Sequence, residues 1–270
     1  MIRFDAYTAT TSGINPHQAL KLFGLEPTDR ITEGPGYHTF GNRVSVKDHA
    51  GDQVLAVLYG GRQADRIMFE VKGDRTPKAV ESLREAAEHR VTRVDACNDW
   101  DRPGAFDELL AAVMEVKSRH RLFGERRGDW EAFPELGRTQ YLGAATSAVR
   151  ARLYEKGKQP EYRHINRLDW VRLELQVRPT KDAKATFSTL SPAEVWGASR
   201  WTRNLAAVVL EQILDAHPPG TVRKDTKRDQ ALRWMSKQYG PHLVSLAGDL
   251  GGWKELGLTL EAMISEAKRR

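Results

Sequence analysis

The segment Ala148–Gln159, AVRARLYEKGKQ, alternates in character as far as Lys156. Side chains of an extended strand point to opposite faces with a period of two residues. One face therefore carries a tyrosine among cations, and the other face is apolar. The two sets are Arg150, Arg152, Tyr154 and Lys156 on the first face and Val149, Ala151 and Leu153 on the second.

A tyrosine in a row of cations suits a phenol that attacks a DNA phosphate. The cations would hold the polyanion, and they would also favour the phenolate, because the ordinary pKa of a phenol, about 10, leaves it protonated at neutral pH. The alternative is an edge strand whose basic face is simply solvated. The rest of the chain has to separate these two interpretations.

The composition is that of a water-soluble protein with a moderate excess of cations. The 270 residues are 40% apolar, and the formal net charge is +6. No apolar run reaches the roughly 18–20 residues that span a membrane, so we expect no membrane partner. The N-terminus lacks a signal-peptide core, and the single cysteine, Cys97, excludes an internal disulfide and a thiolate zinc cluster. We therefore expect a cytoplasmic protein, and the charge is compatible with a nucleic-acid partner.

The order of elements predicts an α+β fold, with a largely antiparallel curved sheet and flanking helices, followed by a helical C-terminal region. Alternating segments predict strands, and 3.6-residue periodicity predicts helices. We expect a catalytic domain over 1–179 and a helical region over 180–270. The expected strands are 2–10, 43–47, 53–59, 66–72, 90–99, 139–143, 148–156 and 167–178, with loops over 33–41 and 124–137. The expected helices are 16–23, 77–89, 105–122, 183–190, 192–214, 225–239, 242–250 and 258–267, and Pro218–Gly220 is the expected linker.

Three of the predicted strands each place one acid on the polar face between apolar neighbours: Glu70, Asp95 and Glu174. Three carboxylates brought together would repel one another unless a cation lay among them. Oxygen ligands of this kind favour Mg²⁺ or Mn²⁺ over zinc. The three acids are thus candidate metal ligands, and the alternative is three solvated residues paired with neighbours such as Arg93 or Arg172.

The histidines exclude one competing design. Many DNA-nicking initiators hold their metal with a His-hydrophobe-His pair, and no two of the eight histidines have that spacing. His164 lies near the tyrosine segment in sequence, where it is either a base or ligand or, more simply, a loop residue.

The blocks FEVKG, TRVDACND, TQYLGA, RARLYEKGKQ and WVRLELQ occur in this order over about residues 66–178. Together they resemble the replication initiation factor (Rep_trans) family, which comprises rolling-circle replication initiators of plasmids and phages and relaxases of integrative elements. The chain departs from the family in the turn Ala144–Ser147, where a serine-rich sequence is usual. Residues 1–60 and 180–270 match poorly.

The resemblance implies an enzyme that nicks one strand of its own phage or plasmid origin through a covalent 5′-phosphotyrosine. It places the nucleophile on Tyr154, assisted by Arg152 and Lys156, and metal ligands on Glu70, Asp95 and Glu174. Tyr141 is the rival nucleophile, although its own segment offers no cations. The implied partners are origin DNA, a host helicase and a DNA polymerase, and the implied assembly is a homodimer.

We expect two groups of cations to bind DNA. Beside Tyr154 these are Arg150, Lys158 and Arg172. In the C-terminal region, a basic helix followed by a second short helix suits DNA docking or dimerisation, and its candidates are Arg223, Lys224, Lys227 and Arg228. The alternative for that helix is a solvated face.

Two other functions stay open from the sequence. One is a non-catalytic, sequence-specific DNA-binding regulator on the same fold, which would form no covalent adduct and would be indifferent to EDTA. The other is a nuclease that uses the acids and a water, for which Tyr154→Phe would still cut.

Overall fold

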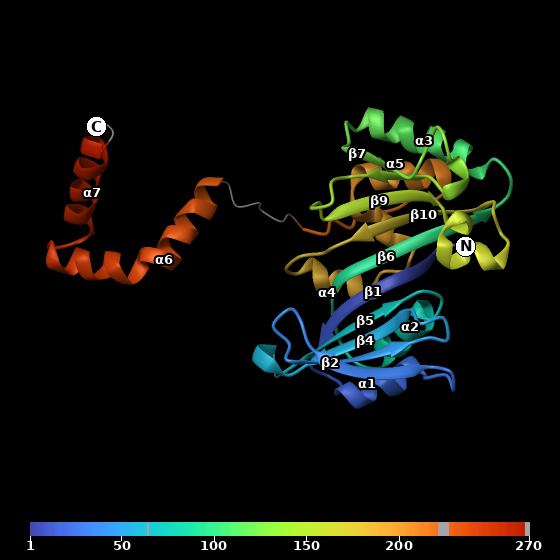
Figure 1. Cartoon of the computed structure of the whole chain (residues 1–270), viewed down its shortest axis with the longest axis horizontal. Helices are drawn as coiled ribbons and strands as arrows, with labels where there is room; N and C mark the ends of the chain where they lie inside the picture. The colour runs from blue at the N-terminus through green and yellow to red at the C-terminus, as the bar shows by residue number, and fades with distance from the viewer. Residues whose placement is uncertain (64, 221–226, 268–270) are drawn as a thin grey trace. The chain divides into compact units, whose positions relative to one another are not determined.

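The computed structural model describes residues 1–63, 65–220 and 227–267. Its main feature is one ten-stranded antiparallel sheet in the order β2-β3-β4-β5-β1-β6-β10-β9-β8-β7 (Figure 1). The strands are β1 (Arg3–Thr11), β2 (Arg30–Pro35), β3 (Asn42–Lys47), β4 (Gln53–Tyr59), β5 (Ile67–Lys72), β6 (Arg90–Asp101), β7 (Gly124–Arg127), β8 (Thr139–Leu142), β9 (Val149–Glu155) and β10 (Trp170–Val177). The predicted α+β fold with an antiparallel sheet is confirmed.

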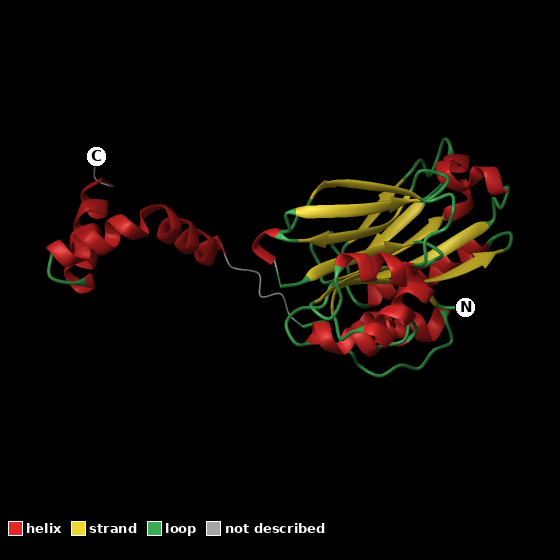
Figure 2. Ribbon diagram, turned by 90° about the horizontal axis from the view of Figure 1, so that it is seen from below, coloured by secondary structure: helices red, strands yellow, loops and turns green. Residues whose placement is uncertain are grey.

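Helices supply the other layer of the core (Figure 2). The apolar face of the sheet shares one hydrophobic cluster with side chains from all of them, for example Phe23, Leu83, Val113, Phe187 and Leu205. The helices are α1 (Pro16–Phe23), α2 (Thr76–Ala86), α3 (Ala105–Arg119), α4 (Ala183–Thr189) and α5 (Arg200–Val209), with the short 3₁₀ segments η1 (Gly61–Gln63), η2 (Pro134–Leu136), η3 (Lys156–Lys158), η4 (Pro160–Ile165) and η5 (Glu194–Ala198).

Local sequence explains where these elements begin. Asn15 caps α1, because its side chain accepts from the Gln18 backbone N–H while the Gln18 side chain accepts from the Asn15 backbone N–H, and Pro16 occupies the first turn. The hairpin β3–β4 turns at Asp48, whose carboxylate accepts from the backbone N–H groups of Ala50 and Asp52.

The polar face of the sheet carries the candidate site. Across the middle strands, Tyr154 of β9 is opposite Arg172 of β10, and Arg172 is opposite Asp99 of β6. Residues two apart on a strand lie on the same face, so Arg152 of β9 and Glu174 of β10 also lie on this face, opposite each other. A register shift between Phe4 and Ala6 interrupts β1 at Asp5.

Two strands were not predicted. β2 and β7 lie at the two edges of the sheet, and their sequences, RITEGP and GERR, lack the apolar alternation that marks a half-buried strand. β7 lies inside the loop expected over 124–137, whereas β2 begins before the loop expected over 33–41 and ends within it.

The compact unit around the sheet extends to Thr221, beyond the boundary expected at 179. The reason is that Phe187, Trp196 and Leu205, from the region expected to be separate, are buried in the core of the sheet. The predicted linker at Pro218–Gly220 lies just before the end of this unit.

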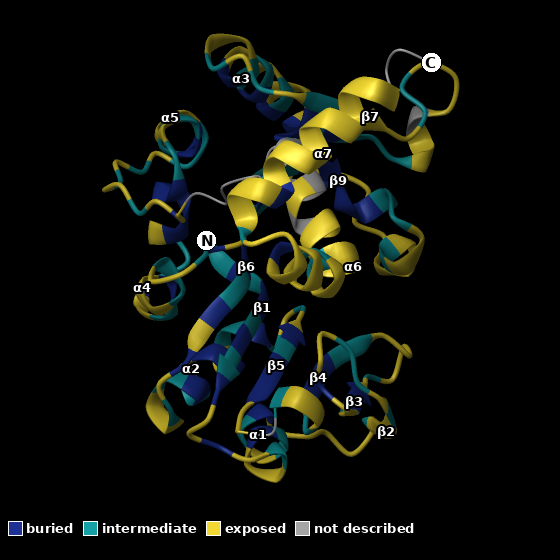
Figure 3. Cartoon of the chain, turned by 90° about the vertical axis from the view of Figure 1, so that its left-hand side faces the viewer, coloured by how far each residue is buried: buried dark blue, intermediate teal, exposed yellow. Residues whose placement is uncertain are grey.

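The second unit, Val222–Arg270, is described by α6 (Lys227–Asp249) and α7 (Trp253–Ala267). The prediction of two helices over 225–250 is wrong, since α6 continues through Pro241. An internal proline removes one helical hydrogen bond but need not end the helix. Most described residues of α6 and α7 are exposed, whereas the strands of the sheet are largely buried (Figure 3). Among the described residues, no helix combines the length and apolarity that a membrane span requires.

Candidate active site

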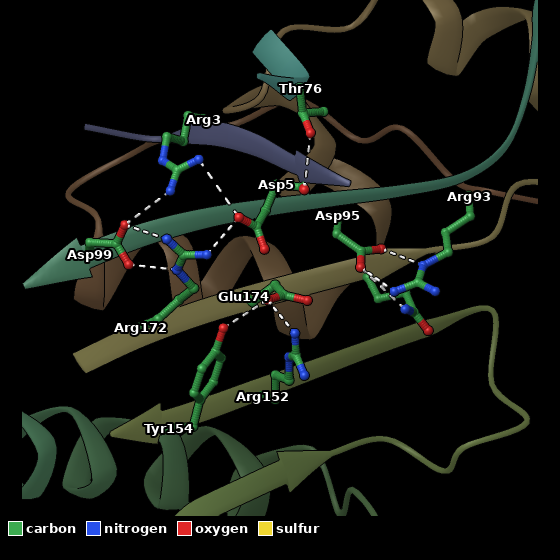
Figure 4. A network of polar contacts seen from close by, with 11 residues as sticks. Arg3, Asp5, Thr76, Arg93, Asp95, Asp99, Arg152, Tyr154, Arg172 and Glu174 are labelled. Carbon is green, nitrogen blue, oxygen red and sulfur yellow. Dashed lines mark hydrogen bonds and ion pairs between the residues drawn. The ribbon is translucent and has the colours of Figure 1, made fainter. Parts of the chain in front are cut away.

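Tyr154, Glu174 and Arg152 form a contact group at the centre of the polar face (Figure 4). The Tyr154 hydroxyl donates to Glu174 Oε2 at 3.3 Å, and an Arg152 guanidinium nitrogen donates to the same oxygen at 2.8 Å. The Arg152 guanidinium also lies 4.7 Å from the centre of the Tyr154 ring. Neighbouring strands β9 and β10 hold the three side chains together, since Arg152 and Glu174 are directly opposite in the register.

Burial sets the protonation of this group. Tyr154 is 3% exposed and Glu174 is 2% exposed. Burial raises the pKa of Glu174 to about 7, with Arg152 acting in the opposite direction. Burial and the neighbouring Glu174 charge raise the pKa of Tyr154 well above its usual value. The phenol is therefore protonated at neutral pH, and the carboxylate beside it can accept its proton.

A second group, around Arg172, was missed from the sequence. Arg172 is completely buried, and its guanidinium donates to Asp99 at 2.6 and 2.7 Å and to Asp5 at 2.6 Å (Figure 4). Burial favours protonation of Asp99, but the hydrogen bonds from Arg172 outweigh it and lower the pKa of that carboxyl. The Arg172 guanidinium has no exposed surface in this arrangement, so the predicted contact between Arg172 and DNA would require the groups that cover it to move.

Lys156 does not continue the strand as predicted. β9 ends at Glu155, and Lys156 begins η3. Its ammonium is buried between two aromatic rings, 4.4 Å from the centre of Tyr162 and 4.6 Å from that of Trp170. Burial lowers the pKa of Lys156 to about 8.

The three predicted metal ligands do not converge. Asp95 is held by Arg93 and by Gln176 Nε2 at 3.4 Å, and Glu174 is held by Arg152 and Tyr154. Glu70 accepts from the Tyr37 hydroxyl and is opposite Thr8, so β1 separates it from β6.

The described part of the chain contains no group of three or more His, Cys, Asp and Glu side chains that could hold a metal ion. Two of the three acids already have arginine partners. The side chains in this arrangement therefore do not fit the predicted Mg²⁺ or Mn²⁺ site.

The remaining predicted DNA-binding residues are dispersed. Arg150 pairs with Glu125 at 3.0 Å, and Lys158 pairs with Glu155 at 2.8 Å. Lys227 and Arg228 lie in the first turn of α6, and Arg223 and Lys224 lie outside the described residues. Two buried guanidinium atoms, Nε of Arg150 and Nε of Arg152, have no hydrogen-bond partner within the described structure. The face around Tyr154 thus keeps two unused donors.

Tyr141 lies beside cations, which its own sequence segment did not predict. Its segment carries no cation, but the neighbouring strands bring two to its ring: Arg150 at 3.9 Å and Arg127 at 5.3 Å from the ring centre. Tyr141 is also more exposed than Tyr154. Tyr141 is therefore a rival to Tyr154 for the role of nucleophile. His164, by contrast, is an exposed residue of η4.

The signal for the missed Asp5 was present in part, because RFDAYTAT alternates and places Arg3 and Asp5 on one face. The sequence does not reveal that β1 lies beside β6, and this pairing is what brings Asp5 to Arg172.

No family model matches the chain, and no curated protein matches it. Among solved structures, a similar one is described as the structure of a rolling circle replication initiator protein from Geobacillus stearothermophilus. It is 18% identical, with a TM-score of 0.49, over 88% of this chain and 96% of that chain. At this level of similarity, the likeness assigns no role to any residue of the chain.

Proposed function

We propose that the chain is a DNA nickase and strand transferase of the rolling-circle initiator kind, with Tyr154 as the nucleophile. The observation that carries the proposal is the hydrogen bond from the Tyr154 phenol to a buried carboxylate, Glu174, whose pKa is raised to about 7. A nucleophile paired with a base that titrates near neutral pH is the arrangement that covalent catalysis needs. The series of sequence blocks over residues 66–178 supports the same assignment.

The proposed reaction is an in-line transfer. Glu174 takes the phenolic proton as the Tyr154 oxygen attacks phosphorus. The bond between phosphorus and the 3′ oxygen breaks, the strand becomes joined to Tyr154 through its 5′ phosphate, and the 3′ oxygen takes up a proton to leave as a hydroxyl. Lys156, with a pKa near 8, is our candidate donor of that proton.

Cations of the same face would stabilise the charge that develops on the phosphate. Arg152 already contacts Glu174, and its Nε and that of Arg150 are buried donors without a hydrogen-bond partner, which a phosphate oxygen could reach once the groups that cover them are displaced. Because the Tyr154 side chain is buried, the DNA has to displace the groups that cover it before attack. Metal dependence of this reaction is a prediction from the sequence.

The test uses single-stranded oligonucleotides that tile the DNA of the genetic element encoding the protein. We expect the wild-type chain to cleave one of them and to remain attached to the 5′ end of the downstream product on a denaturing gel, with the adduct on the Tyr154 peptide by mass spectrometry. Tyr154→Phe should abolish cleavage and adduct while leaving binding largely intact. Tyr141→Phe is the matched control, and it should retain both activities.

Full cleavage by Tyr154→Phe would refute the assignment. An adduct on the Tyr141 peptide would move the nucleophile to that residue. Repeating the reaction with EDTA and with added Mn²⁺ measures the metal dependence separately.

The burial of Tyr154 and the dispersed acids favour one second candidate, a DNA-binding regulator that does not cut. It predicts binding of a specific duplex, no covalent adduct with the wild-type chain, and no response to EDTA.

A further inference from the structure

A cavity of about 650 Å³ lies on the polar face of the sheet, away from Tyr154, where β5, β1 and β6 are neighbours. Register-matched residues form its floor: Glu70 is opposite Thr8, and Thr8 is opposite Arg93. Arg178, which follows β10, and Lys184 of α4 complete one side. The cavity is large enough for a nucleotide-sized group.

The residues that line this cavity carry a large excess of positive charge. Five cations line it against one acid, Glu70; they are Arg66, Lys72, Arg93, Arg178 and Lys184. The acid is engaged by the Tyr37 hydroxyl, and Arg93 is engaged by Asp95. Arg66 is likewise paired with Asp65, which leaves Lys72, Arg178 and Lys184 as the lining cations without an acidic partner in the described structure, and such charges attract anions.

The two lysines are the available charges. The described part of the chain provides neither the Lys72 ammonium nor the Lys184 ammonium with a hydrogen-bond or ion-pair partner, whereas the guanidinium groups of the cavity's arginines each have one. Thr8 and Thr10 add hydroxyls to the lining, and His38 and Phe40 add aromatic rings. Ammonium groups, hydroxyls and rings together are the contacts by which proteins hold phosphates and bases of a single strand.

We infer that this cavity binds the phosphates of a DNA single strand at a site remote from the nick. The inference rests on the proposed function, because it identifies the strand as part of the substrate of Tyr154. It adds a second anchor, formed by Lys72 of the FEVKG block and Lys184, that is separate from the Tyr154 group.

The distance between the two sites fits one continuous strand. Tyr154 is in register with Arg172 and Asp99, and Asp99 is six residues along β6 from Arg93 of the cavity. That offset is about 20 Å along the strands and about 10 Å across them. About six stacked nucleotides cover this length, or fewer when the strand is extended.

The test measures binding by fluorescence anisotropy in the Tyr154→Phe background, so that cleavage does not interfere. The probes are labelled 20-nucleotide and 4-nucleotide single strands, with the sequence of the cleaved oligonucleotide or oligo-dT. We compare Lys72→Ala, Lys184→Ala and their double variant with Lys78→Ala. Lys78 is an exposed lysine of α2, on the opposite side of the sheet, and its variant removes the same charge.

We expect each cavity variant to weaken binding of the 20-mer by about tenfold at low salt, which is the loss of one charge-assisted hydrogen bond. The double variant should reduce the slope of log affinity against log salt by about 1.4, because two fewer phosphates of a single strand are neutralised. The 4-mer should bind more weakly than the 20-mer, and its affinity should be the same for all of the variants. Lys78→Ala should bind both probes as tightly as the Tyr154→Phe parent. Both lysines are solvent-accessible, so the variants should keep the circular dichroism of the parent.

Equal binding of the 20-mer by the double variant and Lys78→Ala would overturn the inference. So would binding of thymidine triphosphate as tight as that of the 20-mer and equally sensitive to Lys72, since the cavity would then be a free-nucleotide site. These outcomes are separate from those that test Tyr154. The nucleophile is judged by the adduct, and the cavity is judged by binding in a background that cannot form one.

Discussion

At the scale of single residues, the contact between Tyr154 and Glu174 predicts the pH dependence of the proposed reaction. Glu174 can accept the phenolic proton only when it is ionised, and its pKa is raised to about 7. The single-turnover rate of adduct formation should therefore rise with pH up to about 7. Lys156 has a pKa near 8 and has to be protonated to serve the leaving oxygen, so the rate should fall above that pH.

Glu174→Gln should lower the rate by about 10²–10⁴-fold and remove the acidic limb of the profile. Lys156→Arg keeps the charge but does not titrate in this range, and it should remove the alkaline limb. The profiles are measured from pH 5.5 to 9 with quenched reactions on denaturing gels. An unchanged acidic limb in Glu174→Gln would show that another group is the base.

Arg172 predicts a large effect on stability. Its guanidinium is buried against Asp5 and Asp99, so Arg172→Met should leave the two carboxylates with Arg3 as their remaining cation, at 3.6 Å from each. We expect the free energy of unfolding to fall by about 3–5 kcal/mol, measured by urea denaturation. Combining Arg172→Met with Asp5→Asn and Asp99→Asn should recover part of the loss. A change below about 1 kcal/mol in the single variant would contradict this account.

At the scale of elements, the backbone of η3 packs closely against the turn that precedes β10. A Cβ on Gly157 would lie 1.7 Å from the carbonyl oxygen of Arg167. Gly157→Ala should therefore push η3 outward and loosen Lys156 from Trp170, at a cost of about 1–3 kcal/mol in stability. Urea unfolding and tryptophan fluorescence measure the two effects. Gly248→Ala is the control, because a Cβ there meets no atom within 4 Å; equal behaviour of the two variants would contradict this close packing.

The sequence predicts the face of a strand on which a side chain lies better than it predicts which strands lie side by side. Alternation placed Tyr154, Glu174 and Asp95 on the polar face correctly, because that pattern is local to each strand. It could not reveal that β1 lies between β5 and β6, which separates Glu70 from the other two acids. The pairing of β1 with β6 also brings Asp5 to Arg172. The pairing of β8 with its chain neighbours β7 and β9 brings Arg127 and Arg150 to Tyr141.

Local sequence patterns also failed to reveal the edge strands and the packing partner of the helices after β10. β2 and β7 carry little apolar alternation because the edges of the sheet bury few of their side chains. The periodicity of residues 183–214 shows that these helices bury one face, but it does not show that the sheet is what covers it.

At the scale of the whole molecule, the two units predict where the chain can be shortened. Among the described residues, every buried member of the main hydrophobic core lies at or before Ala206, and the unit around the sheet ends at Thr221. A chain of residues 1–221 should therefore unfold cooperatively in urea with a midpoint close to that of the full chain, and it should still form the Tyr154 adduct. A chain of residues 1–179 loses Phe187, Trp196 and Leu205, three large buried side chains whose removal costs about 3–5 kcal/mol each for the aromatic ones. We expect it to be unfolded or aggregated by circular dichroism and size-exclusion chromatography, and a folded 1–179 chain would instead support a domain boundary at 179.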